Sequence, residues 1–264
     1  IAIAKRAVSE RHYMLVRVGM DSGIDGLGYC YVGHKAGSLA TVAVTDLIRG
    51  ILVGRELTDM DSIWESMYGE SLLHGRRGSV LRAISAIDMA LWDSVAKDAD
   101  SPLYKYIGGI DKDMVPAYAS GGYYADGKTV DDLANEMSGY VHMGFSAVKM
   151  KVGRVPPEED ELRIRAVREA IGYDVKLFLD VNNGWPDIGT SVRAIEMFEK
   201  YQPGWIEEPL MPDEIKGHAE ISRRVRTPIA TGEIHATHWE FQQIIDLGAA
   251  SILQADAGVC GGVT

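Results

Sequence analysis

The residues best suited to chemistry lie in the second half of the chain, where lysines and carboxylates accompany short apolar runs. Lys149 and Lys151 are two residues apart in the run 147–151. Acidic residues end or follow four later runs, namely Asp180, Glu207, Glu233 and Asp256. Three carboxylates in one place form the all-oxygen site that Mg²⁺ prefers. A lysine beside a cation can act as a base, because the cation lowers its pKa. The set therefore indicates metal-assisted proton abstraction.

These residues belong to a repeated pattern that starts near residue 115. Short apolar runs occur at 115–119, 147–151, 175–180, 204–207, 228–231 and 251–256. Amphipathic helical patterns separate them, at 131–142, 158–171, 191–201, 214–225 and 238–247. Strands and helices that alternate at this spacing predict parallel strands joined by right-handed crossovers.

Two architectures fit this alternation, an open doubly wound sheet and a (β/α) barrel. Residues two apart on a strand point to the same face, so Lys149 and Lys151 share one face at a strand end. In a barrel the carboxyl ends of all strands meet at one mouth, whereas an open sheet spreads them along an edge. No glycine-rich phosphate fingerprint follows the first strand. These observations favour a TIM-like barrel.

The first part of the chain has a different pattern. An apolar run at 13–18, a turn at 21–23 and a second run ending near Tyr31 predict an antiparallel hairpin. Helical patterns follow at 39–52, 60–68 and 79–97. Strands followed by helices indicate an α+β domain. We therefore expect a separate α+β domain over residues 1–112 and a barrel domain over residues 113–264.

Roles for the polar residues follow from the chemistry. Asp180, Glu207 and Glu233 are the predicted ligands of Mg²⁺, with Mn²⁺ as the alternative ion. Lys151 is the predicted base, and Lys149 is expected to neutralise a substrate carboxylate. Removing a proton next to a carboxylate creates an enediolate dianion, which a metal and cationic donors stabilise. The alternative for any one carboxylate is a helix cap or a salt bridge, and for one lysine a solvated ammonium.

Several motifs along nearly the whole chain resemble the enolase superfamily, and within it the mandelate racemase group. In the first domain they are LHGRRG at 73–78, RAISAIDMALWD at 82–93, PLY at 102–104 and GG at 108–109. In the second domain they are VKMKVG at 148–153, DVN at 180–182, WIEEP at 205–209, TGE at 231–233, QAD at 254–256 and GGV at 261–263. The resemblance implies a capping domain (enolase N-terminal-like) and a barrel with a bound divalent metal.

The resemblance also implies residue roles. Lys151 matches the catalytic second lysine of the family, and Asp256 matches an aspartate that pairs with a histidine from the seventh strand. That histidine and the last strands are expected beyond Thr264, so strands 1 to 6 are present and the barrel is expected to be incomplete at its C-terminus. Asn182 matches a position that often contacts substrate. Glu208 is expected to be structural rather than a ligand.

Two histidines have open roles. His235 lies two residues after Glu233 and is expected either to hydrogen-bond a substrate hydroxyl or to support its loop. His34 lies in a polar segment, 33–37, that fits either a lid over the barrel or an ordinary surface loop. Both are kept as candidate substrate-binding residues.

Composition excludes several classes of protein. The formal charge of −11 without a basic stripe argues against nucleic-acid binding. The two cysteines, Cys30 and Cys260, are far apart and indicate neither a disulfide framework nor a zinc site. No apolar run is long enough to cross a bilayer, and residues 1–6 lack the pattern of a signal peptide. We expect a cytoplasmic protein with a small carboxylate substrate, and the resemblance implies a homo-oligomer.

The function we expect is dehydration of a sugar acid, an aldonate or aldarate, to a 2-keto-3-deoxy acid. Lys151 would take the α-proton, and the histidine oriented by Asp256 would protonate the departing β-hydroxyl. A racemase or epimerase of a 2-hydroxy acid is the alternative enzyme, since it shares the first proton transfer. A non-catalytic metal-binding scaffold is the alternative of another class.

Overall fold

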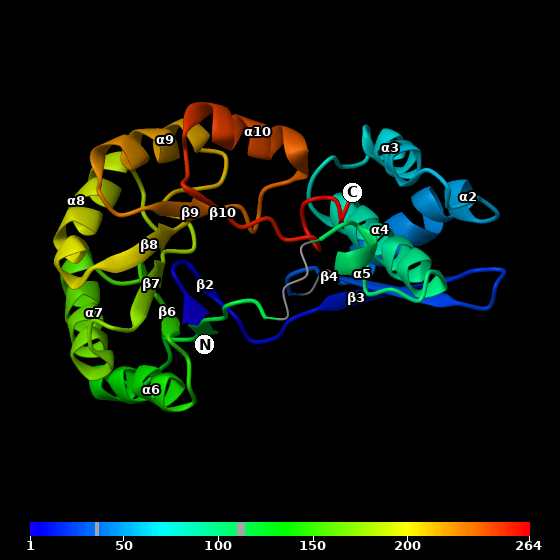
Figure 1. Ribbon diagram of the computed structural model, residues 1–264. Helices are drawn as coiled ribbons and strands as arrows, with labels where there is room; N and C mark the ends of the chain where they lie inside the picture. The colour runs from blue at the N-terminus through cyan, green and yellow to red at the C-terminus, as the bar shows by residue number, and fades with distance from the viewer. Residues whose placement is uncertain (35–36, 110–113) are drawn as a thin grey trace. The chain divides into compact units, whose positions relative to one another are not determined.

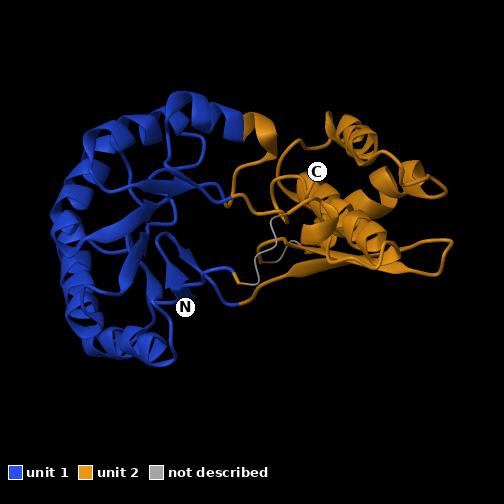
Figure 2. Cartoon of the chain, viewed as in Figure 1, with its two compact units in different colours: residues 1–9, 115–232, 241–254 blue, residues 10–114, 233–240, 255–264 orange. Residues whose placement is uncertain are grey.

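The computed structural model of the chain describes residues 1–34, 37–109 and 114–264. These residues form two compact units, shown in different colours in Figure 2. Unit 1 comprises Ile1–Ser9, Val115–Gly232 and Phe241–Gln254. Unit 2 comprises Glu10–Met114, Glu233–Glu240 and Ala255–Thr264. The domain boundary that the sequence predicts, between residues 112 and 113, lies outside the described residues.

Unit 1 is built on a six-stranded parallel sheet (Figure 1). Its strands are β5 (Ala119–Ser120), β6 (Ala147–Lys151), β7 (Lys176–Asp180), β8 (Pro203–Glu207), β9 (Ile229–Thr231) and β10 (Ile252–Leu253). Each strand pairs with the next in chain order, so the sheet has no strand-order reversal. This order is that of a barrel rather than of a doubly wound sheet, as the sequence predicted. A separate small antiparallel pair joins β1 (Ala2–Ile3) and β2 (Arg6–Ala7).

Helices connect successive strands of this sheet. They are α6 (Val130–His142), α7 (Pro157–Ile171), α8 (Ile188–Phe198) with the 3₁₀ turn η2 (Glu199–Tyr201), α9 (Ile215–Arg224) and α10 (Thr237–Leu247). Figure 1 shows α6 to α9 in a curved row outside the strands. The sequence determines where they begin: Thr129 and Asp132 form a capping box at α6, and Pro157 stands in the first turn of α7.

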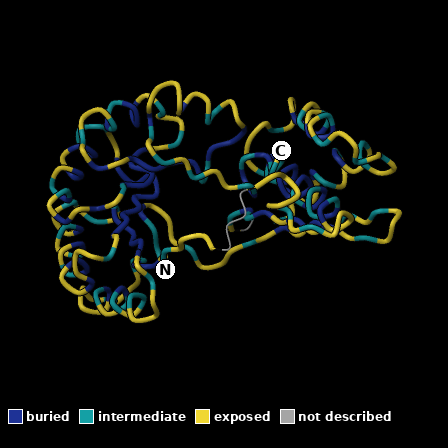
Figure 3. The backbone as a smooth tube through the Cα atoms, in the orientation of Figure 1, coloured by how far each residue is buried: buried dark blue, intermediate teal, exposed yellow. Residues whose placement is uncertain are grey.

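The core of unit 1 lies between the strands and these helices. Every residue of β6 and β9 is buried, and Figure 3 shows the buried segments inside the outer row of helices. Val148 and Met150 of β6 are fully buried in this core. Because side chains alternate along a strand, Lys149 and Lys151 face the other side of the sheet. Parallel pairing then aligns Lys151 with Asp180, and Asp180 with Glu207. Pairing register thus puts the three side chains in one row.

Unit 2 contains an antiparallel hairpin of β3 (Tyr13–Gly19) and β4 (Asp25–Tyr31). Its helices are α1 (Gly37–Val42), the π-helical η1 (Ala43–Ile48), α2 (Arg49–Leu52), α3 (Met60–Ser71), α4 (Ser79–Asp98) and α5 (Leu103–Tyr106). Helix α4 packs directly on the hairpin backbone at two glycines. A Cβ atom on Gly26 or Gly28 would lie 1.9 Å from a carbonyl oxygen of α4. The glycines are therefore required by this close approach.

Unit 2 also contains the segment after β10, which α3 and α4 hold through hydrogen bonds. Trp64 Nε1 donates to the carbonyl oxygen of Gly261 at 2.7 Å. The Asp88 carboxylate accepts from the backbone amides of Val263 and Thr264 at 2.6 and 2.9 Å. Burial raises the pKa of this carboxyl above its ordinary value, although these hydrogen bonds oppose the shift.

The bounds of two strands differ from those predicted from the sequence. β10 ends at Leu253, so the prediction that Asp256 closes this strand is wrong. The Asp256 carboxylate instead accepts a hydrogen bond from the Gly258 amide at 2.8 Å, a local bond that favours a turn over a strand. The first strand includes only Ala119 of the predicted run 115–119, in which Pro116 has no N–H to donate to a neighbouring strand. No helix in the described ranges is long and apolar enough to span a membrane.

Candidate active site

The inner face of the sheet in unit 1 carries a buried ion pair between β6 and β8, the two strands that flank β7. Lys149 Nζ donates to both carboxylate oxygens of Glu207, at 2.7 and 2.8 Å. It lies 3.5 Å from Asp180 Oδ2. Both carboxylates are fully buried. Burial alone would lower the pKa of the Lys149 ammonium, but the two negative charges and the hydrogen bonds to Glu207 outweigh it and raise this pKa above its ordinary value. Lys149 therefore remains cationic.

Lys151 makes the second ion pair of this cluster. Its Nζ atom lies 2.5 Å from Asp180 Oδ2, and its side chain is 8% exposed. The two lysines thus balance the two carboxylates. Contact between two basic and two acidic side chains makes such deep burial tolerable, because each group has a partner of opposite type. The predicted association of Lys149, Lys151, Asp180 and Glu207 in unit 1 agrees with this geometry.

Two further side chains, which sequence reasoning missed, hold Glu207 in place. Trp205 Nε1 and Gln254 Nε2 donate to Glu207 Oε2 at 3.1 and 2.9 Å. Trp205 could have been found, because it lies two residues before Glu207 and so shares its face of the strand. Gln254 is 47 residues away in sequence and has no such local signal.

Aromatic rings lie beside the ion pairs. Phe178 and Trp205 are stacked with centroids 3.4 Å apart, and Tyr118 meets both edge-on. Lys149 Nζ lies 5.4 Å from the centroid of the Tyr118 ring. Lys151 Nζ lies 5.3 Å from the centroid of the Tyr123 ring. Ring faces at these distances stabilise ammonium groups, so each lysine has an aromatic neighbour as well as a carboxylate.

The segments that follow β7 and β8 have unusual backbone conformations. Asn182 and Glu208 have φ angles of +47°. Asparagine tolerates this left-handed region, whereas a glutamate adopts it only when its surroundings require it. The Asn182 amide donates to Asp180 Oδ1 at 2.9 Å, which fixes the carboxylate from its own chain. Glu208 is fully buried, and its amide donates to the carbonyl oxygen of Ala230.

The donor set of unit 1 fits a hard divalent cation. Asp180 and Glu207 provide carboxylate oxygens side by side in register. Three other buried oxygens have no hydrogen-bond partner within the described residues, namely Asn182 Oδ1, Thr231 Oγ1 and Gln254 Oε1. All of these are oxygen donors of the kind that Mg²⁺ prefers.

The remaining predicted site residues, His34, Glu233, His235 and Asp256, belong to unit 2. Glu233 and His235 follow β9, and His235 is buried. Asp256 and His34 are exposed. Across the described part of the chain, no three His, Cys, Asp or Glu side chains are arranged to hold a metal ion. The convergence of Glu233 with Asp180 and Glu207, and the substrate contacts of Asn182, His34 and His235, stay predictions.

Comparison with known proteins identifies the family. Residues 1–108 match the model of the mandelate racemase/muconate lactonizing enzyme N-terminal domain, and residues 132–264 match that of the enolase C-terminal domain-like family. The chain belongs to the mandelate racemase/muconate lactonizing enzyme family of the enolase superfamily. This membership confirms the resemblance seen in the sequence, and with it a capping domain and a barrel domain.

Curated relatives of this family member include sugar-acid dehydratases. Arabinonate dehydratase of Saccharolobus solfataricus is 33% identical over 267 residues, which cover 100% of this chain and 70% of that protein. L-Talarate/galactarate dehydratase of Salmonella typhimurium is 34% identical over 261 residues, which cover 98% of this chain and 64% of that protein. The chain thus spans about two thirds of the length of these relatives.

Solved structures of the family are also similar. A racemase from Streptomyces coelicolor with bound magnesium aligns with a TM-score of 0.89 and 35% identity, over 95% of this chain and 69% of that one. L-Talarate dehydratase from Polaromonas sp. JS666, complexed with Mg and L-glucarate, aligns with a TM-score of 0.88 and 32% identity, over 95% and 69% of the two chains. The family member described here is therefore of a lyase or racemase type.

Proposed function

We propose that this protein catalyses Mg²⁺-dependent removal of the proton next to the carboxylate of a sugar acid, followed by loss of the β-hydroxyl as water. The product would be a 2-keto-3-deoxy acid. The buried cluster of Lys149, Lys151, Asp180 and Glu207 carries the proposal, because its lysines and carboxylates are the groups that this proton transfer requires. The names of its dehydratase relatives support the substrate class.

Each residue has a distinct part in the proposed reaction. Lys151 Nζ would accept the α-proton as a neutral amine, the form that Mg²⁺ held by Asp180 would favour. Lys149 Nζ, which the surrounding charges keep protonated, would face the substrate carboxylate. Asp180 and Glu207, with Glu233 as the predicted third ligand, would hold Mg²⁺, for which Mn²⁺ is the alternative. Bound Mg²⁺ would supply Lewis-acid stabilisation of the negative charge that develops on the substrate. Asp256 would orient the group that protonates the leaving hydroxyl.

The test uses the native protein with Mg²⁺ and a panel of aldonic and aldaric acids. We expect one or more acids to give a 2-keto-3-deoxy product and to exchange the α-proton in D₂O. Lys151→Ala should abolish both signals. Lys176→Ala is the matched control, because Lys176 is exposed at the opposite end of the neighbouring strand. Exchange that survives in Lys151→Ala would refute the assignment of the base.

A racemase is the second candidate, because a racemase is among the similar solved structures. It would exchange the α-proton and invert the α-carbon but would form no keto acid, so the same panel separates the two reactions. If no acid exchanges its proton, the non-catalytic scaffold becomes the better explanation. We also propose a homo-oligomer in the cytoplasm, which light scattering and cell fractionation test.

A further inference from the structure

We infer that Asp160 and Arg163 of α7 are positioning residues for Lys151. They fix the main chain at the end of β6 and the loop after β5, and this fixes the direction in which the Lys151 side chain leaves the strand. The inference rests on the proposed role of Lys151 as the base. Neither residue faces the ion-pair cluster, since both lie on the helix outside the sheet.

Arg163 joins the ends of two adjacent strands. Its Nη1 atom donates to the carbonyl oxygen of Lys151 at 2.9 Å, and its Nη2 atom donates to the carbonyl oxygen of Gly122 at 3.1 Å. The Lys151 amide also points to the Gly122 carbonyl, at a longer distance of 3.4 Å. The direct backbone contact is therefore weak here, and the guanidinium supplies the stronger link between the two segments.

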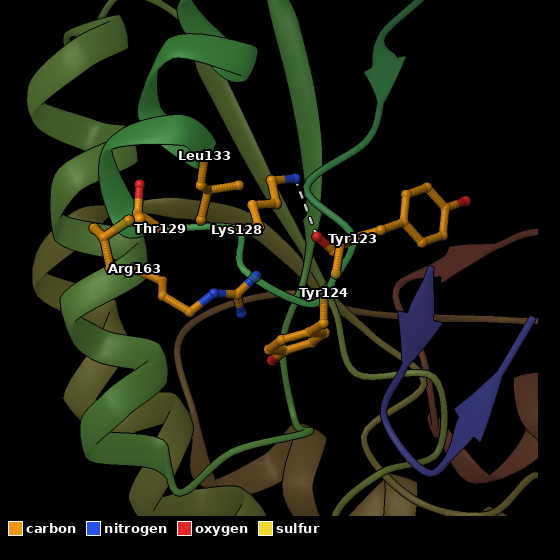
Figure 4. Close-up of a pocket in the computed structure, with 8 residues that line it drawn as sticks. Tyr123, Tyr124, Lys128, Thr129, Leu133 and Arg163 are labelled. Carbon is orange, nitrogen blue, oxygen red and sulfur yellow. Dashed lines mark hydrogen bonds between the residues drawn. The ribbon is translucent and has the colours of Figure 1, made fainter.

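Asp160 holds the guanidinium and the neighbouring loop together. Its carboxylate is 1% exposed and accepts from Arg163 Nη1, from the Tyr124 hydroxyl and from the Gly153 amide, each at 2.6 Å. The Arg163 guanidinium carbon also lies 3.8 Å from the centroid of the Tyr124 ring. Figure 4 shows these two side chains next to one another. Burial and the nearby Asp160 charge raise the pKa of the Tyr124 phenol, which therefore stays a donor.

The loop after β5 is held from a second side by α6. Glu136 accepts from the Gly122 amide at 3.0 Å and pairs with Lys128, whose Nζ atom donates to the Tyr123 carbonyl at 3.0 Å. A small open pocket, whose lining residues are drawn in Figure 4, lies between these contacts and Arg163. These polar contacts hold the loop in place, and with it the Tyr123 ring beside Lys151.

A second arginine on the same helix provides an internal comparison. Arg168 is buried and donates to four carbonyl oxygens, those of Gly172, Val175, Tyr201 and Gln202. These residues precede β7 and β8, so Arg168 acts at the amino-terminal ends of the strands. In barrel enzymes the carboxyl ends carry the chemistry and the amino ends carry stability. The two arginines therefore make similar bonds, but we expect loss of Arg163 to affect catalysis and loss of Arg168 to affect stability.

The test compares Arg163→Lys with Arg168→Lys in the native protein, with Asp160→Asn as a third variant. Lysine keeps the charge but cannot bridge two carbonyls and a carboxylate in a fixed plane. We expect Arg163→Lys to lower kcat for α-proton exchange by roughly 10- to 100-fold with little change in KM, since a displacement of about 1 Å can cost about 100-fold. Arg168→Lys should lower the melting temperature and change kcat by less than about 2-fold.

A second readout does not depend on activity. Hydrogen–deuterium exchange should increase at residues 121–124 and 151–154 in Arg163→Lys and Asp160→Asn, but at residues 172–177 and 201–204 in Arg168→Lys. Equal kcat in the two arginine variants would overturn the inference, as would unchanged exchange at 151–154 in Arg163→Lys. If the wild-type protein exchanges the α-proton of no acid, the proposed function fails. The positioning of the Lys151 main chain is still upheld if amide exchange increases at residues 121–124 and 151–154 in these variants.

Discussion

Replacing Lys149 by methionine tests the charge balance of the buried cluster. The change keeps the apolar stem of the side chain and removes the ammonium that bonds both oxygens of Glu207. Glu207 would then be a fully buried carboxylate without its lysine partner. Breaking one side of a buried ion pair costs about 3–5 kcal/mol. Trp205 and Gln254 still donate to Glu207, so we expect a loss near the lower end, about 3 kcal/mol.

Thermal unfolding with a chelator present measures this cost. At about 2–4 °C per kcal/mol, a loss of about 3 kcal/mol lowers the melting temperature by roughly 6–12 °C. Lys176→Met, at an exposed position, is the control and should change the melting temperature by less than about 2 °C. We further expect Mg²⁺ to stabilise Lys149→Met more than wild type, because a cation there no longer competes with the ammonium.

Two results would refute this reasoning. If Lys149→Met melts within about 2 °C of wild type in chelator, Lys149 is not the counter-charge that makes burial of Glu207 tolerable. If Mg²⁺ raises the melting temperatures of both proteins equally, the cation and the lysine do not share the same carboxylates.

Three other predictions concern stability and reactivity. Gly28→Ala should cost about 1–3 kcal/mol in thermal unfolding, because its Cβ would lie 1.9 Å from the Ala86 carbonyl oxygen. Burial opposes the charged form of Glu136, but its hydrogen bonds and Lys128 hold its pKa below the ordinary value. Its contribution is therefore lost as pH falls through that lowered pKa, so the difference in melting temperature between wild type and Glu136→Gln should shrink as pH falls below the ordinary glutamate pKa of about 4.3. Burial raises the pKa of both thiols, that of Cys30 to about 11. Because Cys30 is fully buried and Cys260 is partly exposed, a thiol reagent should label Cys260 before Cys30 in native protein.

A specific result would refute each of these three predictions. Gly28→Ala as stable as wild type would mean that α4 can move away from the hairpin at little cost. A constant difference in melting temperature from pH 7 to pH 3 would mean that the Glu136 charge is not stabilised by its partners. Simultaneous labelling of both thiols in native protein would contradict the burial of Cys30.

The part of the site that could be predicted follows from short-range geometry. The spacing of Lys149 and Lys151 fixes their common face, and strand ends place Asp180 and Glu207 at the same edge. Gln254 could not be predicted, because its bond to Glu207 depends on how the three strands β8, β9 and β10 pair. Asp256 was misplaced because a local hydrogen bond to Gly258 competes with strand pairing, which an apolar pattern does not reveal.

The fold was predicted on the same basis. Helices with a capping box or an N-terminal proline, such as α6 and α7, agree with the predicted ranges to within a residue. The short elements β1, β2 and α5 were not predicted, because two to four residues are too few to show a period. The π-helical turn η1 was also not predicted, since its side chains continue the helical pattern on either side.

The two glycines beneath α4 have a consequence for the accuracy of folding. If β4 slid by one residue along the helix, Leu27 or Tyr29 would take the place of a glycine, where even one methyl group meets a carbonyl oxygen. A shift by one would also turn the apolar face of the hairpin outward. A one-residue shift of β4 is thus disfavoured by steric clash with α4 as well as by loss of apolar burial. The hairpin can therefore pack on α4 in only one alignment.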